Sequence, residues 1–182
     1  MLHELQRQKL MHLFHVFDIN ENGTLEAADF ELIAHRLADE RGWPRRSLER
    51  QQLLASYQVV WQSVKDSADS NHDDLVSPEE WLDWHTALLD RETVFHAGIL
   101  DVARWIFQAC DLDGDGYIYS DDYARFFRAH SLAETASYAW FERLDSNGDG
   151  KLSKSEIFAS LREFYFSCDP ESPGNYLFGD YR

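Results

Sequence analysis

Residues 145–156 carry oxygen-bearing side chains at a spacing that suits a metal ion. Calcium takes six to eight oxygen ligands at about 2.4 Å, and a loop of twelve residues can wrap them around one point. Side-chain oxygens are expected at loop positions one, three, five and twelve, and a backbone carbonyl at position seven. Gly150 stands at position six, where the sharp turn requires a positive φ. The expected ligands are Asp145, Asn147, Asp149, the Lys151 carbonyl and Glu156.

The same spacing occurs three more times. In chain order, we call the segments loop one (18–29), loop two (69–80), loop three (111–122) and loop four (145–156). The ligands expected in loop one are Asp18, Asn20, Asn22, the Thr24 carbonyl and Asp29. Those expected in loop two are Asp69, Asn71, Asp73, the Leu75 carbonyl and Glu80. Those expected in loop three are Asp111, Asp113, Asp115, the Tyr117 carbonyl and Asp122. Four matches of this length predict a repeated calcium-binding unit.

The loops differ at positions that influence ion preference. Loops one and three close with Asp29 and Asp122, whereas loops two and four close with glutamate. The shorter aspartate supplies fewer oxygens, so we expect these two loops to accept Mg²⁺ as well as Ca²⁺. In loop one, Glu26 at position nine can replace part of the missing coordination through water. In loop two, Asp74 replaces the glycine at a cost of roughly 1 kcal/mol, so we expect this loop to bind weakly or last.

Each loop must be held between two helices. Apolar residues recur at helical spacing on both sides of the loops, as Leu13, Phe14 and Phe17 do before loop one. This helix–loop–helix arrangement is the EF-hand. EF-hands pair because one alone cannot bury its apolar faces, and residues at loop position eight form a short antiparallel bridge between partners. The predicted bridges are Leu25–Val76 and Ile118–Leu152.

The sequence therefore predicts an all-α protein in which two EF-hand pairs pack into one compact globule. The expected divisions are an N-terminal pair at 1–90, a C-terminal pair at 91–165 and an aromatic tail at 166–182 that packs back on the core. Ser47 is predicted to cap a long helix before loop two. A helix from about Val94 is predicted to lead into loop three, and Ser131 to cap the helix that leads into loop four.

Charge and composition limit the other possible functions. The net charge of −16 is unfavourable for binding nucleic acid or an anionic membrane, and it suits a cation binder. No apolar stretch approaches the ~18 residues of a membrane span, charges interrupt any signal-peptide core, and two cysteines form no disulfide framework. We therefore expect a cytoplasmic monomer whose partners are calcium ions, and no protein partner is indicated. No nucleophile–base pair or phosphate-binding glycine loop is evident, so we predict that the protein is not an enzyme.

These features resemble the four-EF-hand sarcoplasmic calcium-binding proteins, including their calerythrin-like bacterial members. The resemblance covers nearly the whole chain. It rests on the four loops, the long linker of the first pair, the closing Asp29 of loop one and the terminal Tyr176–Gly179 segment. It implies a compact helical protein that buffers or transports calcium and has no catalytic activity.

Two other functions stay open. A calcium sensor would expose an apolar surface to a protein partner, but such surfaces are often rich in methionine and this chain has only Met1 and Met11. The second is a calcium-dependent carrier of an apolar small molecule, because the coelenterazine-binding proteins resemble this fold. Core packing already explains most of the tryptophans that would favour it.

Overall fold

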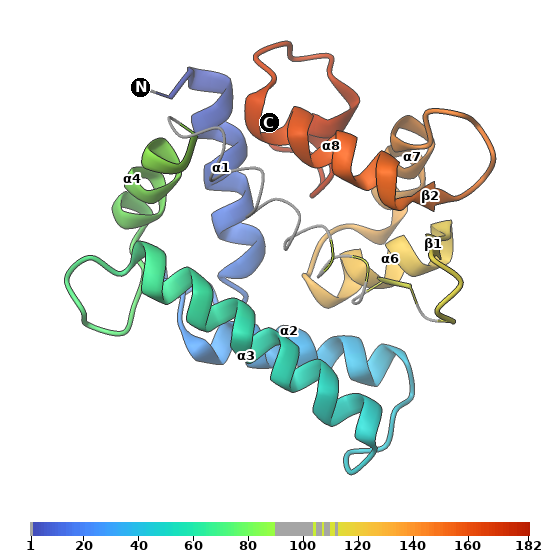
Figure 1. Cartoon of the computed structure of the whole chain (residues 1–182), viewed down its shortest axis with the longest axis horizontal. Coiled ribbons are helices and arrows are strands. Elements are labelled where there is room, and N and C mark those ends of the chain that lie inside the picture. The colour runs from blue at the N-terminus through green and yellow to red at the C-terminus, as the bar shows by residue number, and fades with distance from the viewer. Residues whose placement is uncertain (1, 90–103, 105–106, 108–109, 112) are drawn as a thin grey trace.

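The computed structural model describes residues 2–89, 104, 107, 110–111 and 113–182. Its first elements are α1 (Glu4–Phe17), α2 (Ala27–Glu40), α3 (Leu48–Ala68) and α4 (Pro78–Leu89). They are followed by β1 (Tyr117–Ile118), α6 (Ser120–Ala129), α7 (Glu134–Leu144), β2 (Leu152–Ser153), α8 (Lys154–Phe166) and the 3₁₀ turn η1 (Pro173–Tyr176) (Figure 1). The predicted all-α class is confirmed. The helix predicted from about Val94 and the boundary predicted between residues 90 and 91 lie outside the described residues.

Side chains at the helix starts agree with the local sequence. At α1, the His3 ring accepts a hydrogen bond from the Leu5 N–H (3.2 Å), while the Gln6 side chain accepts one from the His3 N–H (2.9 Å). At α3, the Ser47 hydroxyl accepts a hydrogen bond from the Arg50 N–H at 3.2 Å. The predicted cap at Ser47 is therefore confirmed.

The predicted cap at Ser131 is wrong. Helix α7 begins three residues later, and its N-cap is Ala133. Ser131 instead follows the end of α6 with a φ of 58°, and the next residue, Leu132, donates its N–H to the Phe127 carbonyl (2.9 Å). This is how a left-handed residue ends a helix. The position that appeared to start one helix therefore closes the previous one.

Short backbone bridges join the loops as predicted. Leu25 and Val76 exchange two N–H···O bonds of 2.9 Å between loops one and two. Strands β1 and β2 pair antiparallel between loops three and four, with Ile118 opposite Leu152. All four of these side chains are fully buried, so each bridge also closes the core beneath its two loops.

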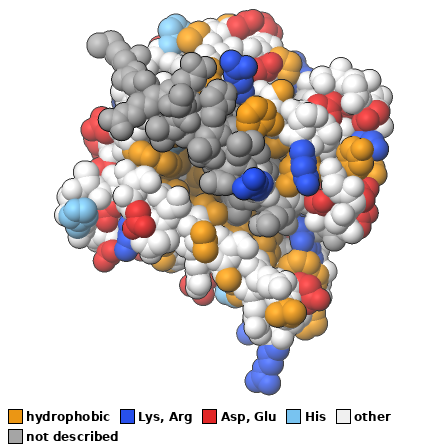
Figure 2. Space-filling model, in the orientation of Figure 1, with side chains coloured by type: hydrophobic (Ala, Val, Ile, Leu, Met, Phe, Trp, Pro, Cys, Tyr) orange, Lys and Arg blue, Asp and Glu red, His pale blue; other side chains and the backbone are white. Residues whose placement is uncertain are grey.

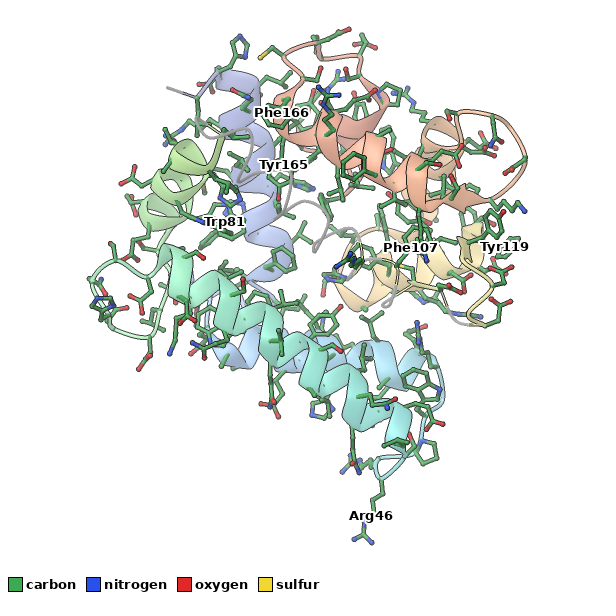
Figure 3. All side chains as sticks on the ribbon, viewed as in Figure 1. Arg46, Trp81, Phe107, Tyr119, Tyr165 and Phe166 are labelled. Atoms are coloured by element: carbon green, nitrogen blue, oxygen red, sulfur yellow. The ribbon has the colours of Figure 1, made fainter. Side chains whose placement is uncertain are left out.

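One hydrophobic core runs through both EF-hand pairs. Helix α1 lies between α4 and α8 (Figure 1). Trp81 of α4 donates its indole N–H to the Leu10 carbonyl of α1 (2.9 Å), and His85 of α4 stacks on Tyr165 of α8 with ring centroids 5.8 Å apart. Trp81 and Tyr165 thus come from helices on the two sides of α1 (Figure 3). The two pairs are therefore packed together rather than held apart by a linker.

Polar contacts also join the exit helices of loops one and three. Arg128 of α6 binds Glu40 of α2 at 2.7 Å and Glu134 of α7 at 2.5 Å. Arg36 of α2 donates to the Ser131 hydroxyl at 2.6 Å. These contacts link α2 and α6 across the boundary between the pairs.

The C-terminal segment lies against α6, α7, α8 and α1. Tyr176, Leu177 and Phe178 are each at most 2% exposed. Trp140 of α7 stacks on Tyr176 with centroids 4.2 Å apart, and the Tyr123 hydroxyl of α6 donates to the Leu177 carbonyl at 2.6 Å. The segment is therefore held by specific contacts rather than lying loosely on the surface.

The surface agrees with the acidic composition. Figure 2 shows acidic side chains at both lateral margins of the visible face, where loop two and loops three and four lie in Figure 1. Among the helices that the structure describes, none has the length and apolar character needed to span a bilayer.

Candidate metal centres

Loop one turns its expected ligands inward. The two oxygens of Asp18 accept the N–H groups of Asn22 (3.1 Å) and Gly23 (2.9 Å), and Gly23 has a φ of 86°. The closing Asp29 is fully buried, and its oxygens accept the N–H groups of Asn20 (3.3 Å) and Glu26 (3.0 Å). Burial raises the pKa of Asp29 to about 6, partly offset by those two hydrogen bonds. A cation would therefore stabilise a carboxylate that its surroundings do not favour.

Glu26, at position nine, also faces this loop. One of its carboxylate oxygens accepts hydrogen bonds from the side-chain amides of Asn20 (3.1 Å) and Asn22 (2.8 Å). The amide oxygens of the same two asparagines accept backbone N–H groups within the loop. Glu26 thus contacts two of the expected ligands, which places a further carboxylate beside the ion position.

In loops two and four, serines hold the closing glutamates. In loop two, one oxygen of Glu80 accepts the Ser70 N–H and hydroxyl, and the other accepts those of Ser77, at 2.9–3.1 Å. In loop four, Glu156 has the same four contacts, made by Ser146 and Ser153 at 2.8–3.1 Å. These serines stand at loop positions two and nine in both cases. Both glutamates are thus oriented by the same device.

The serines also favour the ionised form of each glutamate. Partial burial would raise the pKa of Glu80, but the hydrogen bonds from Ser77 and Ser70 outweigh it and lower the pKa to about 2. Glu156 shows the same balance, and its pKa is lowered by Ser153 and Ser146. The closing residues of loops two and four are therefore charged before any ion binds.

Loop two accommodates its missing glycine. Asp74 adopts the left-handed conformation with a φ of 64°, and its N–H donates to Asp69 at 3.1 Å. Its carboxylate binds Lys65 of α3 at 2.7 Å. Asp74 therefore takes the backbone shape that glycine would take, and its side chain projects to a neighbouring cation instead of into the loop.

Loop three brings three aspartates together. One carboxylate oxygen from each of Asp111, Asp113 and Asp115 lies within 4.8 Å of the others. Oxygens on opposite sides of one Ca²⁺ are about 4.8 Å apart, so all three can contact a single ion. Tyr119 at position nine donates its hydroxyl to Asp115 at 3.0 Å and lies at the edge of the molecule beside this loop (Figure 3). The donor set therefore fits calcium, a hard cation that prefers oxygen.

The closing Asp122 of loop three is held differently. One oxygen accepts the Tyr119 N–H (3.3 Å), and the other accepts Arg125 of the same helix at 3.1 Å. Burial raises the pKa of Asp122, although Tyr119 and Arg125 oppose this effect. Asp29 and Asp122 thus share a raised pKa, in contrast to the two closing glutamates.

Comparisons with known proteins agree with this geometry. Residues 100–162 match the family model of the EF-hand domain pair. Over 160 residues the chain is 27% identical to calerythrin of Saccharopolyspora erythraea, which covers 87% of this chain and 90% of calerythrin. It is 26% identical over 139 residues to sarcoplasmic calcium-binding proteins I, III and IV of Branchiostoma lanceolatum, covering 72% and 73% of the two chains. The chain is an EF-hand protein similar to calerythrin and to the sarcoplasmic calcium-binding proteins.

A solved structure supports the fold of this calerythrin-like protein. The coelenterazine-binding protein of Renilla muelleri, in its calcium-loaded apo form, aligns with a TM-score of 0.80 over 98% of this chain and 99% of that one. The two sequences are 22% identical. At this identity the likeness shows that the fold is shared, and it gives no information on the ligand.

Sequence analysis did not identify several residues that hold the ligands of this EF-hand protein. Ser70, Ser77, Ser146 and Ser153 were outside the expected set, although a serine three residues before a glutamate is a known capping signal. Arg125 was also missed. Its spacing of three residues from Asp122 on a helix is the signal that could have found it.

Proposed function

We propose that this protein binds Ca²⁺ at three or four of its loops, through the ligands named for each, and buffers or transports the ion in the cytoplasm. The buffering function is supported above all by the buried tail. Tyr176, Leu177 and Phe178 cover apolar side chains of α6, α7 and α8. A sensor must offer such a surface to its target. Here the chain itself occupies it.

The tail is also fastened to the N-terminal pair. Lys9 of α1 is fully buried and donates to Asn175 of the tail at 2.7 Å and to the Ser167 carbonyl at 2.9 Å. His12 of α1 lies 2.8 Å from the Phe178 carbonyl. Release of the tail would break contacts with both pairs, which favours a protein that stays closed when it binds calcium.

The two kinds of closing residue support different ion preferences. Loops one and three close with an aspartate, fully buried in the case of Asp29 and partly buried in the case of Asp122, which suits the smaller coordination shell of Mg²⁺ as well as Ca²⁺. Loops two and four close with a glutamate that is already ionised and oriented. We propose that loops one and three bind either ion and that loop four is the most selective for calcium. Loop two binds more weakly because of Asp74.

A calcium titration by calorimetry, with and without millimolar Mg²⁺, tests the proposal together with the fluorescence of an apolar dye. We expect three or four sites with dissociation constants on the order of 10⁻⁹ to 10⁻⁷ M for the tightest, and dye fluorescence that falls as calcium binds. A rise in dye fluorescence on calcium binding would identify a sensor instead. An organic molecule released from the purified protein and detected by mass spectrometry would identify a carrier.

Exchanging the closing residues tests the ion preferences. Asp29→Glu and Asp122→Glu are expected to reduce competition by Mg²⁺ at their own loops, because the longer side chain can supply a second oxygen to Ca²⁺. Glu156→Asp is the reverse change and should introduce such competition in loop four. Equal Mg²⁺ competition before and after all three changes would contradict this assignment.

A further inference from the structure

Arg125 places a positive charge on the closing residue of loop three. Its guanidinium lies 3.1 Å from one oxygen of Asp122, and the Tyr119 N–H lies 3.3 Å from the other. The side chain of Asp122 is 13% exposed and that of Arg125 is 35% exposed. Both carboxylate oxygens are therefore engaged, one of them by a full charge that is partly shielded from water.

The other loops lack this arrangement. The residue three positions after the closing carboxylate is Leu32 in loop one, Asp83 in loop two and Ala159 in loop four. Among the described residues, Asp29 accepts backbone N–H groups, and Glu80 and Glu156 accept serine and backbone donors. A cation on the closing residue therefore distinguishes loop three from the other three.

We propose that Arg125 acts as an electrostatic latch that weakens Ca²⁺ binding at loop three by competing with the ion for Asp122. The inference rests on the proposed function, because it assumes that loop three binds calcium. An ion that takes both Asp122 oxygens must displace the guanidinium, and one that takes a single oxygen must tolerate a nearby positive charge. Asp111, Asp113, Asp115 and Asp122 would otherwise give this loop the most negative set of ligands among the four. Arg125 offsets part of that charge.

The size of the effect follows from the geometry. Ion pairs that are this accessible to water are weak, which corresponds to a change of about two- to fivefold in an equilibrium constant. Removing the repulsion between Arg125 and a divalent ion adds to this. We expect Arg125→Ala to tighten Ca²⁺ binding at loop three about three- to tenfold, and the gain should shrink at high salt because the charges are then screened.

The experiment uses terbium as a calcium probe in the full-length chain. Tyr117 stands at position seven of loop three, where the other loops hold Thr24, Leu75 and Lys151, so its ring can sensitise emission from an ion in this loop. Loss of the emission in Tyr117→Leu assigns the signal to loop three. Displacement of terbium by Ca²⁺ then gives the calcium affinity of this loop.

Two further variants sharpen the comparison. Arg7→Ala removes the same charge from an exposed position on α1 and should change the affinity of loop three by less than about twofold. Leu32→Arg places an arginine at the equivalent position of loop one, on a side chain that is 37% exposed. It should weaken the corresponding calorimetric site about two- to fivefold. Circular dichroism and thermal unfolding establish that each variant is folded.

The outcomes separate the latch from the proposed function. Tighter binding in Arg125→Ala supports the latch, as does terbium emission that appears only in this variant. Binding that is unchanged or weaker in Arg125→Ala overturns the latch while leaving calcium binding at loop three intact. Absence of Tyr117-sensitised emission and of a calorimetric site in both proteins overturns calcium binding at loop three, and the latch with it.

Discussion

Gly174 is the position where the tail comes closest to α8. A Cβ atom added there would lie 2.4 Å from the Ser160 carbonyl oxygen and 2.6 Å from the Glu163 Cβ. The oxygen belongs to the backbone of a helix and cannot rotate away. The backbone at Gly174 does not have a positive φ, so space rather than conformation demands glycine here. Gly174→Ala therefore tests whether the tail is packed as closely as the structure indicates.

The expected loss of stability combines two terms. Overpacking a closely packed site costs about 1–3 kcal/mol. Replacing glycine with alanine restricts the unfolded chain and returns about 0.4–1 kcal/mol. The difference between the two terms is roughly 0–2.6 kcal/mol. Because the added atom would meet a helix backbone that cannot rotate away, the overpacking term lies above the bottom of its range, and we expect a net loss of about 1–2 kcal/mol. Undocking the tail would relieve the strain, but it would expose Tyr176, Leu177 and Phe178 at about 1.5–3 kcal/mol each. Since undocking costs more, we expect the tail to stay bound and the contact with α8 to loosen.

Thermal unfolding of the calcium-loaded protein measures this loss. At about 2–4 °C per kcal/mol for a chain of this size, Gly174→Ala should lower the melting temperature by about 2–8 °C. Apolar dye binding should stay at the wild-type level. Glu171→Ala is a matched control in the exposed part of the tail and should change stability by less than about 0.5 kcal/mol. A Gly174→Ala protein that melts with the wild type would refute the close contact. One that binds dye strongly would show that the tail is held less firmly than its burial implies.

Three further changes test other parts of the fold by denaturant unfolding. Asp74→Gly should stabilise the protein by about 0.5–1 kcal/mol, because relief of the left-handed backbone exceeds the value of the exposed ion pair with Lys65. Burial lowers the pKa of Lys9 to about 8, so the unfolded chain binds more protons between pH 8 and about 10.5. Wild-type stability should therefore rise relative to Lys9→Met across that window, by up to about 3 kcal/mol. Burial also lowers the pKa of His130 to about 4, so stability is lost as pH falls from about 6.5 to 4, and His130→Phe should reduce that loss by up to about 3 kcal/mol. If the free energy of unfolding of a variant changed with pH as steeply as that of the wild type, the lowered pKa of the replaced residue would be contradicted.

The loops and their pairing could be predicted because the relevant geometry is local. A calcium loop places all its ligands within twelve residues, so spacing alone locates it. The Leu25–Val76 and Ile118–Leu152 bridges follow once the loops are known, because partners meet at position eight. The start of α7 was harder to predict from the sequence. Ser131 is a residue type that often caps the start of a helix, but its backbone adopts the left-handed conformation that ends α6. The sequence does not distinguish these two roles.

Apart from the two loop bridges, individual side-chain contacts between residues that are distant in sequence could not be predicted. Lys9 falls on the buried side of α1, between Leu5 and Leu13, where a charge is normally unfavourable. Its acceptors, the Glu163 and Ser167 carbonyls and the Asn175 side chain, are more than 150 residues away. They satisfy the ammonium group, and two of them are carbonyls at the C-terminal end of α8. Only the packing of α1 on α8 reveals that this lysine caps a helix of the other EF-hand pair.

Each EF-hand pair joins a loop closed by aspartate to one closed by glutamate. Serine hydrogen bonds orient Glu80 and Glu156 and lower their pKa values before an ion binds. The pKa values of Asp29 and Asp122 are raised instead. Ionising the closing residue therefore costs less in the glutamate loops than in the aspartate loops. The backbone bridge then couples the two loops of each pair, because a segment that is fixed in one loop positions the segment paired with it in the other. We therefore expect calcium binding in the C-terminal pair to be cooperative and to begin at loop four, whereas in the N-terminal pair the left-handed Asp74 keeps loop two from binding first.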